Sequence, residues 1–333
     1  MQRFLSVMLA AMLLLSLAAC GEKKQQSTEN AETAAVTETI EKTDVPTDEE
    51  TKGNHEVISL SFIKTFDQTP SLEEQSIYEK DGVTITAKSI KYDTVHGPQI
   101  MLDVKNDTDN DLLIQNYHTT VNGFMMKPEI DLNVPKHKKL EAPMSLPYLD
   151  LAMADIHSLS DVGISLSILD SKTFSVLDTT ETVKLDLLNT SDSQTPFNEE
   201  GQLAFDSKGV KVILQGVKKD TLFDSRRVLM VYLQNDTDRT ICVKNNQLKV
   251  NGYDITTTMS TVILPHTKAV DKIELFDQDL DEYGITTIDA VNVAFEVNDY
   301  EDWKPIVISG TISVELPTEI ISEEEENASE PTE

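Results

Sequence analysis

The feature that most constrains how this chain can fold is an internal repeat. Four short segments of the first half recur in the same order in the second half, three of them at spacings of 129 to 131 residues. The matches are Lys80-Asp81-Gly82-Val83 with Ser207-Lys208-Gly209-Val210, Asn106-Asp107-Thr108-Asp109 with Asn235-Asp236-Thr237-Asp238, Val121-Asn122-Gly123 with Val250-Asn251-Gly252, and Thr182-Val183-Lys184-Leu185 with Ser313-Val314-Glu315-Leu316. A repeat of this length predicts that one unit of structure is built twice. We therefore expect two similar domains, over residues 76–190 and 200–316.

Each copy has the pattern of short antiparallel strands. Apolar residues alternate with other residues over 100–105 and again over 229–234, as in strands with one buried face. The Asn-Gly pairs at 122–123 and 251–252 are typical of two-residue type I′ hairpins, and the Asn-Asp-Thr-Asp segments are typical of turns. Residues 149–158 and 276–283 could each form one short helical turn. The sequence thus predicts an all-β chain of two tandem antiparallel immunoglobulin-like β-sandwiches.

The alternation also predicts the direction of individual polar side chains. Asn116 and Asn245 occupy equivalent positions and should face inward, where one hydrogen bond common to both copies would satisfy them. Cys242 should face the other way and be about half covered. It has no cysteine partner within the repeats, so we expect it to act as a small apolar residue.

The order of these elements resembles a known family. An alternating strand, then Asn-x-(Thr/Ser)-Asp, an apolar strand and Val-Asn-Gly are similar to the immunoglobulin-like repeats of Gram-positive surface lipoproteins, including a telokin-like secreted family with no assigned function. The resemblance covers residues 76–316. Because its motifs are structural turns, it implies the fold and no catalytic residue.

The N-terminal segment predicts where the protein resides. Arg3 precedes an apolar run from Phe4 to Leu17, which is shorter than the roughly 20 residues needed to span a bilayer. Leu17-Ala18-Ala19-Cys20-Gly21 resembles the lipobox of bacterial lipoproteins, which implies a diacylglyceryl group on the Cys20 thiol and cleavage before it. We expect a signal peptide over 1–19 and lipid anchoring on the outer, extracytoplasmic face of the cell membrane.

The composition predicts flexible acidic ends and excludes some partners. Residues 20–55 and 317–333 are rich in Glu and Thr and poor in large apolar residues, so we expect a disordered tether and a disordered tail. The chain has 58 Asp and Glu against 28 Lys and Arg, a net charge of −30. This charge argues against nucleic acid and anionic lipid headgroups as partners and favours a cationic protein.

One stretch of the second copy concentrates this acidity. Residues 273–303 hold ten acids and no Lys or Arg. The candidate face for a cation or a partner comprises Asp277, Asp279, Asp281, Glu282, Asp299, Asp302 and Trp303. The first three acids alternate like the start of a calcium-binding loop, but Glu282 stands where such a loop has glycine. An irregular calcium site, a solvated acidic turn and a partner surface all remain open.

The tryptophan and the remaining polar residues leave several functions open. Trp303, the only tryptophan, could close the sandwich core, contact a partner or stack on a sugar. The six histidines are scattered, and no catalytic motif is complete, so we expect no enzyme activity and no cofactor besides the lipid. The predicted function is a membrane-anchored extracytoplasmic binding or structural module. A solute- or polysaccharide-binding lipoprotein and a calcium-dependent adhesion module are the alternatives.

Overall fold

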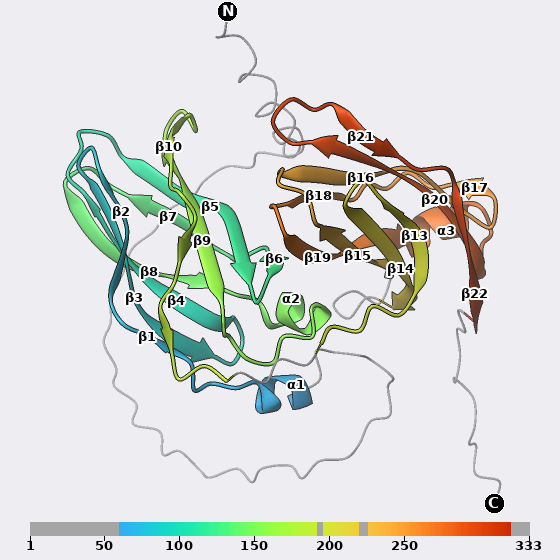
Figure 1. Cartoon of the computed structure of the whole chain (residues 1–333), viewed down its shortest axis with the longest axis horizontal. Coiled ribbons are helices and arrows are strands. Elements are labelled where there is room, and N and C mark those ends of the chain that lie inside the picture. The colour runs from blue at the N-terminus through green and yellow to red at the C-terminus, as the bar shows by residue number, and fades with distance from the viewer. Residues whose placement is uncertain (1–59, 192–195, 220–225, 321–333) are drawn as a thin grey trace, which may run out of the picture. The chain divides into compact units, whose positions relative to one another are not determined.

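A computed structural model describes residues 60–191, 196–219 and 226–320 (Figure 1). These residues all belong to one unit of the chain, Gly53–Glu333. The predicted signal peptide, Cys20, the tether over 20–55 and all but the first residues of the predicted tail lie outside the described residues. In the described part, no helix is both long and apolar enough to cross a membrane.

The first repeat forms a β-sandwich of two antiparallel sheets. One sheet has the order β2-β3-β4-β8, and the other is centred on the pair β5 and β9. The bounds are α1 Leu60–Thr65, β1 Ser71–Leu72, β2 Gln75–Lys80, β3 Val83–Asp93, β4 Gly97–Asn106, β5 Leu112–Val121, β6 Phe124–Met126, β7 Asp131–Val134, β8 Lys138–Ser145, α2 Tyr148–Met153, β9 Val162–Asp170, β10 Val176–Thr179, β11 Val183–Lys184 and β12 Leu187–Leu188.

The second repeat forms the same kind of sandwich. Strands β13, β14, β15 and β19 make one sheet, and β16 and β20 with shorter strands make the other. The bounds are β13 Gln202–Ser207, β14 Val210–Lys219, β15 Arg226–Asn235, β16 Ile241–Val250, β17 Tyr253–Asp254, β18 Ser260–Ile263, β19 Thr267–Phe276, α3 Asp277–Glu282, β20 Thr287–Asp299, β21 Pro305–Ile308 and β22 Ile312–Ile320. The prediction of an all-β chain with two sandwiches is confirmed, and α2 and α3 lie at the two predicted helical turns. α1, which precedes the predicted start of the first repeat at residue 76, was not predicted.

The alternation of apolar residues builds the core of each sandwich. Three strand residues of β4 and three of β15 are fully buried: Ile100, Leu102, Val104, Leu229, Val231 and Leu233. Their inward parity is as predicted. Cys242 was predicted to point to the opposite face of its strand and to be half covered, but its side chain is only 1% exposed. Its Sγ lies 3.4 Å from Ser260 Oγ on the neighbouring strand β18.

The two Asn-Gly hairpins have the predicted type I′ backbone. Both central residues have positive φ, 50° and 82° at Asn122-Gly123 and 49° and 90° at Asn251-Gly252. Asn122 ties its hairpin to the loop before β9, and Asn251 ties its hairpin to the first residue of β20. Asn122 Nδ2 donates to the Ser158 carbonyl at 2.7 Å, and Asn251 Nδ2 donates to the Thr287 carbonyl at the same distance.

The predicted common hydrogen bond of Asn116 and Asn245 is absent. Asn245 is buried and bridges to a neighbouring segment, donating to the Thr257 carbonyl at 2.9 Å and accepting from the Met259 amide. Asn116 is only half-buried and accepts from Thr119 Oγ1 at 2.8 Å within its own strand. Asn116 lines a cavity together with residues of β18 and β19 of the second repeat.

Candidate functional site

The acidic residues predicted to form one face lie at two separate places. Four of the acids belong to α3, which precedes β20: Asp277, Asp279, Asp281 and Glu282. Asp299 is the last residue of β20, and Asp302 and Trp303 lie in the turn that follows it. At about 3.3 Å per residue, the strand between them is roughly 40 Å long. The run of acids is continuous in sequence but is divided by a strand, so it does not make a single face.

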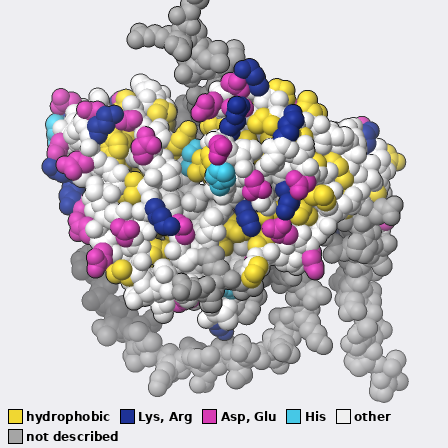
Figure 2. Space-filling view, in the orientation of Figure 1, with side chains coloured by type: hydrophobic (Ala, Val, Ile, Leu, Met, Phe, Trp, Pro, Cys, Tyr) yellow, Lys and Arg dark blue, Asp and Glu magenta, His cyan; other side chains and the backbone are white. Residues whose placement is uncertain are grey.

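Several of these acids are already paired with bases. Asp277 Oδ1 lies 3.5 Å from Arg227 Nη1, Asp299 Oδ2 lies 3.0 Å from Arg239 Nη1, and Asp302 Oδ2 lies 2.6 Å from Lys304 Nζ. Figure 2 shows acidic and basic side chains interspersed over the face in view. Among the residues that the structure describes, no three His, Cys, Asp or Glu side chains are grouped so that they could hold a metal ion.

Trp303 does not close the core of the sandwich. Its side chain is 51% exposed, and its φ of 57° lies in the left-handed region that bulky residues avoid. Its ring lies 5.8 Å from that of Tyr300, which in turn lies 6.2 Å from the His118 ring of the first repeat. The interpretation as a core residue is therefore wrong, and contact with a partner or a sugar stays open.

The first repeat has an equivalent exposed aromatic residue that the sequence analysis missed. Phe174 precedes Trp303 by 129 residues, has φ 55° and is 64% exposed. It follows Asp170 as Trp303 follows Asp299, at the same spacing of four. An Asp-x-x-x-aromatic pattern at the repeat spacing was the signal that could have found it. We call residues 170–175 and 299–304 the aromatic hairpins.

The hydrogen bonds of the two aromatic hairpins are the same. The amide of Phe174 donates to the Asp170 carbonyl at 2.9 Å, and that of Trp303 donates to the Asp299 carbonyl at 3.0 Å. Each aspartate carboxylate accepts amides from inside its turn, at 2.8 Å from Thr173 and 2.9 Å from Glu301. These amide donors hold the pKa of both carboxyls below the usual range for aspartate. The turns are thus held by charged hydrogen bonds and present their rings outward.

A second feature is the junction between the repeats. The sheet of β5 and β9 continues into β15 and β19 through a parallel bridge between Phe124 in β6 and Lys268 in β19. Phe197, in the connection between the repeats, stacks on Tyr232 at 5.1 Å and packs on Phe124 at 5.3 Å. Tyr232 is fully buried there, and its hydroxyl donates to Glu199 Oε1 at 2.8 Å. Burial of these rings favours a fixed joint over a flexible one.

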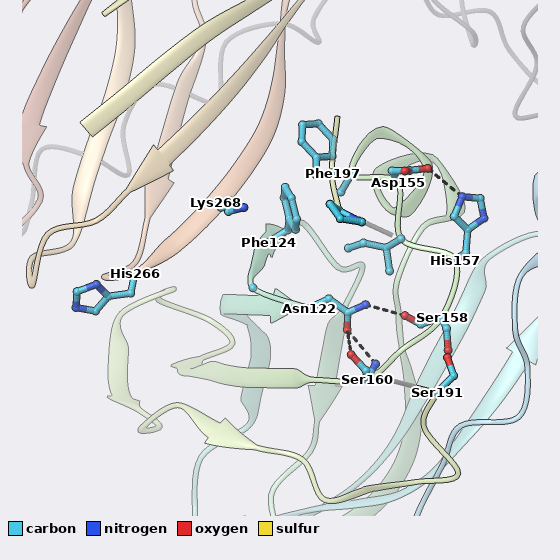
Figure 3. Close-up of a pocket in the computed structure, with 14 residues that line it drawn as sticks. Asn122, Phe124, Asp155, His157, Ser158, Ser160, Ser191, Phe197, His266 and Lys268 are labelled. Carbon is cyan, nitrogen blue, oxygen red and sulfur yellow. Dashed lines mark hydrogen bonds and ion pairs between the residues drawn. The ribbon is translucent and has the colours of Figure 1, made fainter. Parts of the chain in front are cut away.

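A cavity of about 260 Å³ lies beside this joint (Figure 3). Its polar side chains are occupied by structural bonds. Asn122 Oδ1 accepts from Ser160 Oγ at 3.0 Å, and His157 Nε2 lies 2.9 Å from Asp155 Oδ1. The cavity therefore has the chemistry of a structural support more than that of a reactive site.

A larger cavity of about 370 Å³ is lined by Asp150, a carboxyl whose pKa is raised. Burial raises the pKa of Asp150, in α2, to about 6, although Lys127 and Lys272 favour its charged form. The neighbouring carboxylate of Asp271 is buried and accepts from Lys127 Nζ at 2.9 Å. The electrostatic balance of this cavity thus depends on whether Asp150 carries a proton. Asp150 is the counterpart of Asp279 in the second repeat.

Replacing Asp150 by asparagine is expected to stabilise the protein at neutral pH. Because the folded-state pKa is raised above 3.8, the folded protein binds more protons than the unfolded chain between about pH 4 and 6. The contribution of Asp150 to the free energy of unfolding is therefore largest below about pH 4, and it decreases as the pH rises from 4 through 6. Asp150→Asn should raise the free energy of unfolding by about 1–2 kcal/mol at pH 7.5 and leave it near wild type at pH 4.

Chemical denaturation across this pH range measures the effect of Asp150→Asn. Asp279→Asn removes the same charge from the equivalent position of α3, outside the cavity, and serves as the control. Equal pH profiles for the wild type and Asp150→Asn would contradict the assignment of the raised pKa to Asp150.

Comparisons with known proteins do not identify a family for this chain. No known protein family and no curated protein matches the chain. A crystal structure of red sea bream transglutaminase aligns with TM-score 0.20 and 15% identity, covering 72% of this chain and 32% of the transglutaminase. The chain thus spans about a third of that enzyme. A protein of unknown function from Porphyromonas gingivalis aligns with TM-score 0.20 and 12% identity, covering 73% of this chain and 99% of that protein.

Proposed function

We propose that this protein is a membrane-anchored extracytoplasmic binding module that presents two sandwiches as one unit. The observation that supports the proposal best is the junction, where Phe197 and Tyr232 stack across the joint. A fixed joint between two repeats keeps equivalent surfaces at a constant separation. Constant separation favours binding to a large or repeating partner, because the second contact is made without further loss of freedom.

The anchor is proposed from the sequence. Leu17-Ala18-Ala19-Cys20 provides a thiol for lipid attachment, and residues 21–55 can act as a spacer because they are poor in large apolar residues. The acids of the second repeat can contribute a contact for a cationic partner, as two separate groups at the ends of β20. An acyl-anchored protein of this kind acts at the cell surface and has no need of a membrane-spanning helix.

Membrane fractionation of the full chain in a bacterial host tests the anchor. We expect the wild type to sediment with the membrane and to require detergent for release, and Cys20→Ala to remain unlipidated and lose this behaviour. Cys242→Ala is the matched control, because it removes the other cysteine from a buried position and should fractionate as the wild type. Protease added to intact spheroplasts should digest the anchored protein. A wild type that is soluble, or that protease cannot reach, would overturn the proposal.

A further inference from the structure

Among the residues that the structure describes, Phe174 and Trp303 are the most exposed aromatic residues of their repeats, and their two hairpins are built alike. Both rings project from left-handed backbone, at φ 55° for Phe174 and 57° for Trp303, and more than half of each side chain is exposed. Core burial therefore does not explain why a bulky side chain occupies a backbone region that favours glycine. An aromatic residue in left-handed backbone occurs at the equivalent position of both repeats.

Both rings are held ready for contact. The Asp170 and Asp299 carboxylates accept amides of their own turns, and each hairpin is closed by main-chain bonds of 2.9–3.0 Å. β10 and β21, which follow the hairpins, are the last strands in their sheets. A partner can thus reach the rings without displacing another strand, and little freedom is lost when it binds.

Several charged side chains beside each ring are paired with a charge of the opposite sign. Lys172 lies 3.2 Å from Asp111, Arg239 pairs with Asp299, and Lys304 pairs with Asp302. The hairpins differ in this respect from the acidic ends of the chain. Compensated charges favour a neutral ligand, and the hydroxyl and charged groups beside the rings can hydrogen-bond to its polar atoms.

We propose that each aromatic hairpin binds one sugar ring of a neutral polysaccharide. The apolar face of a pyranose packs on the plane of Phe174 or Trp303, and the sugar hydroxyls bond to the side chains that flank the ring. Two equivalent sites on one chain match a ligand that repeats its own unit, and binding at both sites raises the affinity above that of either alone. This inference rests on the proposed function as a surface binding module, for which it names the partner.

Co-sedimentation of the detergent-solubilised full chain with cellulose, chitin and insoluble starch tests the proposal. We expect retention on at least one of these solids. Phe174→Gly and Trp303→Gly should each weaken binding about tenfold, and the double variant about a hundredfold, because both contacts are then lost. Glycine accepts the left-handed backbone, so these variants should melt no lower than the wild type. Tyr253→Ala removes an aromatic residue that is 48% exposed outside the hairpins and should bind as the wild type.

Other outcomes would overturn the polysaccharide assignment. Retention on none of the three solids, or retention that the double variant keeps, would exclude these sites as proposed. Loss of sedimentation with phosphatidylcholine vesicles in the variants would assign the rings to lipid, and loss of self-association would assign them to a second copy. Membrane fractionation of the same variants separates the test of the polysaccharide sites from the test of the lipid anchor. A variant that still sediments with the membrane but no longer binds polysaccharide has lost the sugar sites and kept the anchor.

Discussion

Replacing Asn106 by alanine is expected to lower the free energy of unfolding by about 2–4 kcal/mol, because the carbonyls of Asn110 and Val134, the second of them buried, lose their donor. Asn106 is fully buried at the end of β4. Its Nδ2 donates to the carbonyls of Asn110 at 2.8 Å and Val134 at 3.0 Å, and its Oδ1 accepts the Thr108 amide at 3.0 Å. One side chain thus ties a turn to β7, on the other sheet.

The second repeat has an equivalent asparagine, Asn235, at which the same substitution can be tested independently. Asn235 is also fully buried, donates to the carbonyls of Arg239 at 2.8 Å and Ile263 at 3.1 Å, and accepts the Thr237 amide at 3.0 Å. Asn235→Ala should therefore destabilise the protein by a similar amount. Chemical denaturation followed by circular dichroism measures both.

A neighbouring asparagine supplies the control for Asn106→Ala. Asn110 is exposed and enters these bonds through its main-chain carbonyl and amide, so Asn110→Ala should change stability by less than about 0.5 kcal/mol. If Asn106→Ala and Asn110→Ala proved equally mild, the buried hydrogen bonds could not be the reason for the repeated Asn-Asp-Thr-Asp segment.

The local patterns of the sequence were sufficient to predict the sandwiches because their causes are local. Strand parity follows from alternating side chains, and the type I′ hairpins follow from Asn-Gly pairs that tolerate positive φ. The arrangement of the acidic residues in space depends on more than local pattern. Density of charge along the chain carries no information on the 13-residue strand β20 that separates the two groups in space.

The junction could not be predicted from the same patterns. Tyr232 has the outward parity of β15, which predicts a half-exposed ring, yet it is fully buried because residues from outside its sandwich cover it. Phe197 lies in a polar connection with no periodic pattern. The aromatic hairpins could have been predicted from the sequence, since Asp170 and Asp299 begin the same turn in the two repeats. The match is easy to overlook because the aromatic residue is Phe in the first repeat and Trp in the second.

Replacing Phe197 by alanine is expected to loosen the joint and to cost about 2 kcal/mol, less than a fully buried phenylalanine because this ring is only partly covered. The variant removes the stack on Tyr232 and the contact with Phe124, the two ring contacts that link the connection to both repeats. Each sandwich keeps its own core, so the loss should fall on the coupling between them. Calorimetry should show the repeats unfolding in more separate steps than in the wild type.

Phe174→Ala is the matched control for this loss of a phenyl ring, because Phe174 is 64% exposed and lies away from the joint. It should leave the unfolding profile of the wild type unchanged. If Phe197→Ala also left it unchanged, the stacked rings would not couple the repeats, and the constant separation on which two-site binding depends would need another source. If the repeats unfold separately as expected, Phe197→Ala should also weaken binding to a ligand that contacts both aromatic hairpins. Neither hairpin is altered, but the second contact then costs more conformational entropy.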